Sequence, residues 1–167
     1  MNEEFPKIEG LPGFCMAVGW IAQNWAMMEQ NFDMWIAIIY HRLDGRTRVE
    51  PRLPIPFSKK VDFLEKAFST LEPLKRFTAE VAPMLKQARE LSQRRNDLVH
   101  GVLRSLGRDG AWVVGVFDYE KAEDRRHWHI DRTFTFSPKD FEALESELVP
   151  LVTSVCKFGV RFEREVP

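Results

Sequence analysis

The sequence carries almost no net charge, since 24 lysines and arginines are matched by 25 aspartates and glutamates. A protein without a broad positive field does not condense onto nucleic acid over its whole surface, so any polyanion must meet a local patch. Hydrophobic residues make up 44% of the 167 residues and charged residues 29%. This composition excludes a disordered or low-complexity protein and is sufficient for one domain with a hydrophobic core.

Cysteine and long apolar runs are also scarce. Cys15 and Cys156 stand far apart in apolar helical stretches, which predicts reduced, buried thiols. The longest apolar run, from Phe14 to Ala22, is about half as long as a helix that crosses a bilayer. The first residues, MNEEFPKIEG, are acidic and lack the basic and apolar regions of a secretory signal. We therefore expect a cytoplasmic protein that does not enter a membrane.

Motifs of several common enzyme classes are absent. The sequence has no glycine-rich phosphate loop, no Gly-x-Ser-x-Gly elbow and no Cys-x-x-Cys pair, which disfavours P-loop, serine esterase and dithiol redox chemistry. His127 and His129 share a face of a predicted strand with Asp131, but no fourth ligand is spaced to complete a zinc site. We expect neither a metal nor a cofactor.

Two basic segments leave two interpretations open. Arg125 and Arg126 lie next to Trp128, which together with Trp112 could stack on single-stranded RNA or pack in the core. The connector from His41 to Pro56 has four arginines and two acids, and is either a solvated loop or a loop that faces phosphate.

Apolar residues recur every three or four positions along four stretches, as in amphipathic helices. These stretches run from Phe14 to Ile39, Phe57 to Leu71, Leu74 to Leu91 and Phe141 to Phe162. In the first of them a second apolar stripe predicts packing on more than one neighbour or on another chain; its members are Trp20, Met27, Met34 and Ile38.

Serine and proline mark where these helices begin or bend. Ser58 and Ser137 are predicted N-caps, and Pro138 suits the first turn that follows. Pro83 predicts either a kink or two helices laid end to end.

The segment from about 111 to 136 has a different pattern. Aromatic and β-branched residues alternate with polar ones in AWVVGVFDYE and RHWHIDRTFTF, which predicts a β-hairpin. The predicted fold is mainly α, a single domain over 1–167. It is a four- to five-helix antiparallel bundle with this hairpin inserted before the last helix.

The third apolar stripe continues past Leu91 to Arg95 and then Leu98. This phase predicts that Arg95 is buried whereas Arg94 is solvated. Removing an arginine from water without a partner costs several kcal/mol. Arg95 is therefore expected either to pair with an acid, such as Glu29, or to be held for a task.

His100 lies five residues after Arg95, near the predicted end of the helix. Asn96 and His100 share a helical face, so the amide could orient the ring. Gly101 suits the position after the last helical residue. A histidine in this place either caps helix carbonyls or transfers protons.

The motif RNDLVH, from Arg95 to His100, resembles the Arg-x(4 to 6)-His signature of the HEPN superfamily. In that family a polar residue commonly follows the arginine, as Asn96 does here. The resemblance implies a metal-independent endoribonuclease of a toxin or antiviral-defence system, working as a homodimer with both motifs in one cleft. By resemblance Arg95 and His100 are catalytic and Asn96 supports them, while Arg94 and Arg104 are expected to bind RNA.

Two features depart from the family pattern. The hairpin is an addition to the minimal bundle, and Val102 replaces the tyrosine of toxins that pair with nucleotidyltransferase antitoxins. An inhibitor protein remains a possible partner. The competing hypothesis is a catalytically silent HEPN-like module that dimerises or binds a partner through its first helix.

Overall fold

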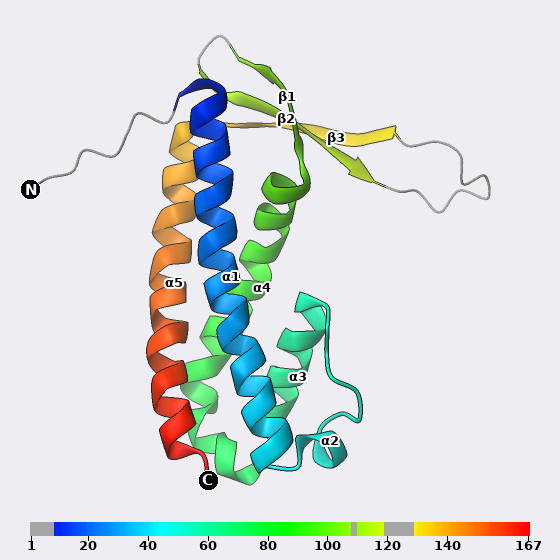
Figure 1. Cartoon of the computed structure of the whole chain (residues 1–167), viewed down its shortest axis with the longest axis vertical. Coiled ribbons are helices and arrows are strands. Elements are labelled where there is room, and N and C mark those ends of the chain that lie inside the picture. The colour runs from blue at the N-terminus through cyan, green and yellow to red at the C-terminus, as the bar shows by residue number, and fades with distance from the viewer. Residues whose placement is uncertain (1–8, 108–109, 119–128) are drawn as a thin grey trace, which may run out of the picture. The chain divides into compact units, whose positions relative to one another are not determined.

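The computed structural model describes residues 9–107, 110–118 and 129–167, without the side chains of 117–118 and 129–131. The described chain is mainly helical with a small antiparallel sheet (Figure 1), which confirms the predicted class. Its elements are α1 (Gly10–Arg42), α2 (Gly45–Arg48), α3 (Phe57–Thr70), the 3-10 helix η1 (Glu72–Phe77), α4 (Thr78–His100), β1 (Val102–Leu106), β2 (Trp112–Asp118), β3 (His129–Phe136) and α5 (Pro138–Glu165).

The chain forms two compact units. The first unit comprises the described residues within Met1–Ala22 and Gln93–Ser146, and the second comprises Gln23–Ser92 and Glu147–Pro167. The helices α1, α4 and α5 each contribute one segment to each unit.

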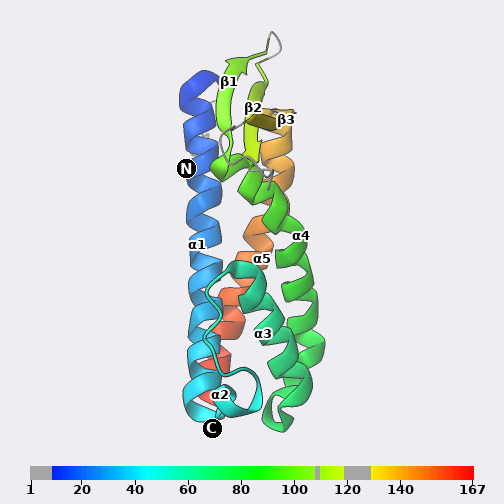
Figure 2. The ribbon, with the colours of Figure 1, turned by 90° about the vertical axis from the view of Figure 1, so that its right-hand side faces the viewer.

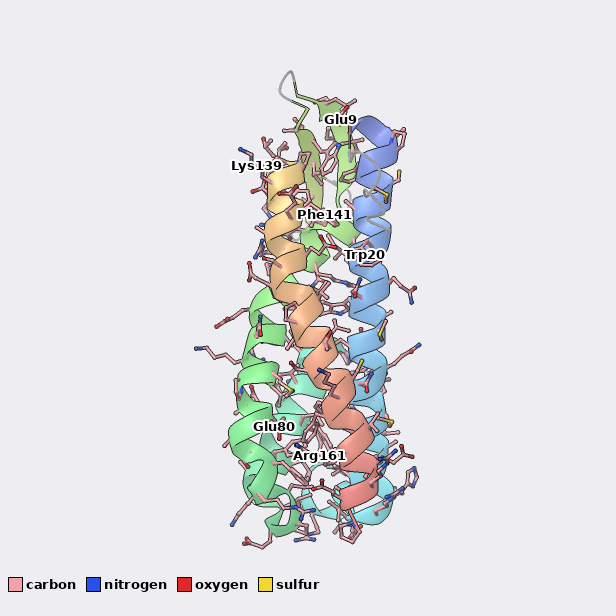
Figure 3. The ribbon with its side chains drawn as sticks, turned by 90° about the vertical axis from the view of Figure 1, so that its left-hand side faces the viewer. Glu9, Trp20, Glu80, Lys139, Phe141 and Arg161 are labelled. Atoms are coloured by element: carbon pink, nitrogen blue, oxygen red, sulfur yellow. The ribbon has the colours of Figure 1, made fainter. Side chains whose placement is uncertain are left out.

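The second unit has an aromatic core. The Trp35 ring of α1 meets Phe158 of α5 edge-on, with 4.8 Å between ring centroids, and Phe158 stacks on Phe162 at 5.4 Å. Arg161 of α5 pairs with Glu80 of α4 (Figure 3) and lies over the Phe158 ring. Because aromatic rings bury large apolar areas, these contacts hold the helices of this unit together.

The main apolar stripe of α1 is buried as predicted, with Ile21, Met28 and Ile39 fully shielded from solvent. Its second stripe is not uniform: Ile38 is buried, but Trp20 and Met27 are 39% and 41% exposed.

The prediction of two buried thiols was wrong. Cys15 is exposed and Cys156 is half-buried, and both are free. The sulfur of Cys156 accepts a hydrogen bond from Asn31. Cys15 follows Phe14 on α1, and the turn of the helix that buries Phe14 directs Cys15 to solvent.

Two helix boundaries differ from those predicted. Ser58 is not an N-cap, because α3 begins at Phe57 after the extended residue Pro56. Of the two alternatives for Pro83, a kink or two helices laid end to end, the second is wrong: α4 begins at Thr78, directly after η1, and runs through Pro83. The break therefore lies before Thr78, whose hydroxyl donates a hydrogen bond to the carbonyl of Phe68.

The sheet has three strands in the order β1-β2-β3, all antiparallel, and belongs to the first unit. The expected hairpin is present as β2 and β3, which pair from Trp112 opposite Phe136 to Asp118 opposite His129. The prediction missed β1, which follows α4 after a single residue and pairs with β2. Most of β1 is exposed and its run of five residues does not alternate clearly, so its sequence lacks the signal of a half-buried strand.

Lys60 of α3 ties that helix to α1, beside it in Figure 2. Its Nζ lies 2.8 Å from Glu29 Oε1 and 2.7 Å from Asp33 Oδ1, and its side chain is only 10% exposed. Burial lowers the pKa of Lys60, but the hydrogen bonds and charges of Asp33 and Glu29 outweigh burial and raise the pKa above its usual value. Glu29, the acid suggested as a partner of Arg95, thus binds Lys60 within its own unit.

We expect Lys60→Ala to lower the free energy of unfolding by about 1 to 3 kcal/mol, between the effects known for exposed and buried ion pairs. Because the pKa of Lys60 is raised, this stabilisation is present at neutral pH and is lost as the pH rises above 10.5. Urea unfolding at pH 7 measures the difference. The matched control is Lys59→Ala, whose exposed pair with Asp62 contributes little. Equal effects of the two substitutions would contradict the assignment.

Candidate functional site

The predicted motif lies on the last turns of α4 in the first unit, and the helix ends at His100. Arg95 is half-buried with its Nε atom shielded from solvent, and its Nη1 donates a 2.9 Å hydrogen bond to Asn96 Oδ1. Arg94 is half-buried as well, so the expectation of a solvated Arg94 beside a buried Arg95 was wrong. In these turns of α4 the buried position of the apolar stripe is occupied by Leu98, which is 2% exposed.

The His100 side chain is exposed at the end of α4. Within the part of the chain that the structure describes, its ring makes no hydrogen bond or ion pair, and the expected contact with Asn96 is absent. At 3.6 residues per turn, residues five apart leave a helix in directions about 140° apart. Helix geometry alone therefore does not bring Arg95 and His100 of one chain onto one face.

Gly101 is required for a different reason than the predicted helix-ending conformation. It does not have the positive φ that marks Gly10 and Gly110. A Cβ atom at Gly101 would overlap with the carbonyl oxygen of Asp97 and with Cγ1 of Val114. Gly101 therefore allows β2 to pass close to the end of α4.

A cavity of about 300 Å³ lies beside the motif, between the end of α4, β3 and the start of α5. Asp97 Oδ1 accepts hydrogen bonds from Arg132 of β3 and, at 2.7 Å, from Gln93 Nε2. Arg94 lines the same cavity with Asp140, and its charge helps to lower the pKa of that carboxyl group. Four charged side chains thus meet at one cavity of the first unit.

Asp97, Arg132 and Asp140 were not predicted from the sequence as site residues. A signal for Arg132 was present: it lies two and four positions before Phe134 and Phe136 in an alternating strand. An arginine in that phase faces the same side of the sheet as the apolar residues. It interrupts the apolar pattern of the strand in the way that Arg95 interrupts the apolar stripe of α4.

The start of α5 is capped as predicted. The Ser137 hydroxyl accepts a hydrogen bond from the Asp140 N–H at 3.3 Å, and Asp140 Oδ2 accepts bonds from the Ser137 N–H and hydroxyl at 2.8 and 2.6 Å. This reciprocal arrangement is a capping box. The hydrogen bonds from the Ser137 side chain and backbone lower the pKa of Asp140; burial opposes them, and the charge of Arg94 adds to them.

The other predicted residues are dispersed or lie outside the described chain. Arg104 is exposed on β1. Arg125, Arg126, His127 and Trp128 fall outside the described residues, as do the side chains of His129 and Asp131.

Trp112 is fully buried against Phe136 and donates a hydrogen bond to the carbonyl of Gly10, so the core alternative holds for this tryptophan. Among the residues that the structure describes, no three His, Cys, Asp or Glu side chains are grouped so that they could hold a metal ion.

No protein-family model, curated protein or solved structure matches this chain. The resemblance to HEPN proteins therefore rests on the motif from Arg95 to His100. Among the described helices, none is both long and apolar enough to span a membrane.

We expect Gly101→Ala to lower the free energy of unfolding by about 1 to 3 kcal/mol, the usual cost of overpacking, because the new methyl group meets Val114 and the Asp97 carbonyl. Chemical denaturation measures this loss. Gly19→Ala is the matched control, since nothing lies within 4 Å of a Cβ atom there. Because Gly19 lies in the interior of α1, this control should raise the free energy of unfolding by about 0.5 to 1 kcal/mol. Similar changes in both variants would contradict the close approach of β2.

We expect Ser137→Ala to cost about 1 kcal/mol at neutral pH through loss of the N-cap. The pKa of Asp140 is lowered, so its contribution is present above its usual value of 3.8 and is lost as the pH falls through the lowered folded-state value. The difference between wild type and Ser137→Ala should therefore shrink in acid. Urea unfolding between pH 7 and pH 2 tests this. A difference that grows on acidification would contradict the capping role of Asp140.

Proposed function

We propose that this chain is a metal-independent endoribonuclease of HEPN type that cleaves single-stranded RNA. The observation that carries the proposal is an exposed histidine at the end of α4, within two helical turns of a half-buried arginine whose guanidinium is held by Asn96. A solvent-accessible imidazole and an oriented guanidinium are the two kinds of group that acid–base chemistry on a phosphodiester needs.

In the proposed reaction the RNA supplies its own nucleophile. The 2′-oxygen attacks the adjacent phosphorus as its proton is removed, the bond to the 5′-oxygen breaks, and that oxygen is protonated as it leaves. The products are a 2′,3′-cyclic phosphate and a free 5′-hydroxyl. His100 acts as base or acid, and Arg95 stabilises the charge on the phosphate oxygens.

The proposal includes a homodimer. One chain supplies one such histidine, whereas the reaction uses both a base and an acid. A two-fold arrangement would bring a second His100 to the same cleft and complete the set. In such a dimer Arg95 and His100 of one chain would not need to share a helix face, because the arginine of one copy could bind a phosphate that reacts with the histidine of the other. The four- to five-helix antiparallel bundle and control by an inhibitor protein remain part of this proposal.

The proposed RNA contacts differ in character. Arg104 is exposed on β1, two residues after the start of the strand that follows His100, and suits a phosphate. Arg94 lines the charged cavity with Asp140, where a carboxylate offsets its charge. We therefore assign phosphate binding to Arg95 and Arg104, and a contact away from the phosphate to Arg94.

The exposure of Trp20 and Met27 on α1 favours a second candidate function, a silent dimerisation or partner-binding module. Large apolar side chains that remain exposed are enriched at protein interfaces. In this case the protein would dimerise without any RNA turnover, and substitution of Arg95 would change stability or association alone.

We expect His100→Ala and Arg95→Ala each to reduce cleavage of single-stranded RNA by about a hundredfold or more, because loss of a general acid–base group or of a charge-stabilising group typically has this effect. The reaction is run in EDTA, and its products are analysed for 2′,3′-cyclic phosphate ends. His41→Ala is the matched control, since His41 is an exposed histidine in the last turn of α1, in the second unit.

Light scattering on the same samples measures the mass in solution. If His100→Ala and Arg95→Ala cleave RNA as fast as wild type, the catalytic proposal is rejected. If no variant cleaves RNA but the wild type is a dimer that Trp20→Ser weakens, the silent module replaces it.

A further inference from the structure

The cavity beside the motif combines apolar walls with a charged rim. Leu98 and Phe136 are 2% and 7% exposed, and Phe134 is half-buried. Four charged side chains also line the cavity and are here called its rim: Arg94, Asp97, Arg132 and Asp140. Its volume of about 300 Å³ lies at the lower end of the range for small-molecule sites.

The charges of this rim cancel, since two guanidinium groups face two carboxylates. A phosphate would be attracted by the arginines and repelled by the aspartates, so the rim does not favour an anion. A flat, uncharged ring with hydrogen-bond donors on one edge and acceptors on another suits both the rim and the apolar walls. Among the parts of RNA, the base has this chemistry.

The rim also discriminates among bases. The N1–H and N2–H₂ groups of guanine are adjacent donors that suit the acceptor positions of a carboxylate, while its O6 and N7 match a guanidinium. Adenine presents the N1 acceptor where guanine presents a donor, so it would meet a carboxylate unfavourably. Asp97 and Arg94 lie three residues apart on α4 and supply one group of each kind.

The hydrogen bonds that Asp97 already accepts do not prevent such a ligand. Asp97 accepts bonds from Arg132 and Gln93 at the same oxygen, Oδ1. A carboxylate has about four acceptor positions. The bonds from Arg132 and Gln93 occupy the two acceptor positions of Oδ1 and orient the carboxylate. The acceptor capacity that a ligand can use is therefore that of the other oxygen, Oδ2.

We propose that this cavity binds a guanine base of the RNA substrate, with Asp97 accepting from the base, Arg94 donating to it and Phe134 packing on its ring. The inference rests on the proposed ribonuclease function. His100 follows Asp97 by three residues on α4, a rise of about 4.5 Å. A base held at Asp97 thus places the neighbouring phosphodiester near the end of the helix, where His100 is exposed.

Calorimetric titration of the full chain with 3′-GMP, 3′-AMP and 3′-UMP tests the proposal. We expect 3′-GMP to bind about tenfold or more tightly than the other two, the discrimination of one good bidentate contact. Asp97→Asn should abolish the preference for 3′-GMP. Phe134→Leu should weaken the binding of all three nucleotides about tenfold. Glu142→Gln, an exposed substitution on α5, is the matched control and should change nothing.

Asp97 also pairs with Arg132, so Asp97→Asn could unfold the first unit. Arg94→Gln is the second variant, and it should likewise lose the preference for 3′-GMP while circular dichroism remains that of wild type. Equal affinities for the three nucleotides, or a preference that survives in folded Arg94→Gln, would overturn the inference.

RNA cleavage distinguishes failure of this inference from failure of the proposed function. Two oligonucleotides that differ by a single G or A are compared as substrates. Cleavage that depends on His100 but is indifferent to this base retains the ribonuclease and rejects the guanine site. Selective binding of 3′-GMP without cleavage of either oligonucleotide retains the guanine site and rejects the ribonuclease.

Discussion

The close approach of β2 to the end of α4 is the constraint on which the candidate site depends. Gly101 makes it possible, because any side chain there would collide with Val114 and the Asp97 carbonyl. With the helix ending against the sheet, β3 pairs along β2 and brings Arg132 to Asp97. A glycine thus determines where two charged side chains from distant parts of the sequence meet.

Paired charges characterise both units, but their settings differ. In the second unit Lys60 is almost fully covered and binds two carboxylates, which ties α3 to α1. In the first unit the Asp97 and Arg132 pair lines an open cavity, next to a motif whose histidine reaches solvent. A covered pair serves mainly packing, whereas a pair at the wall of a cavity remains available to a ligand.

Much of the fold was predictable because helices depend on local periodicity. The apolar stripe of α1, the capping of α5 by Ser137 and the two strands of the hairpin follow from residue spacing and capping chemistry. β1 was missed because an exposed strand lacks alternation. Cys15 was misplaced because an apolar stretch of helix has an exposed side as well as a buried one.

For the candidate site, the sequence by itself determined that Arg95, Asn96 and His100 lie on one short segment at a helix end. Tertiary structure decided the rest: that Asn96 binds Arg95 and not the His100 ring, that Glu29 belongs to Lys60, and that Asp97 faces a cavity with Arg132. The physical reason is range. Helical phase and capping act within a few residues, whereas the partner of a charged side chain depends on which distant element packs beside it.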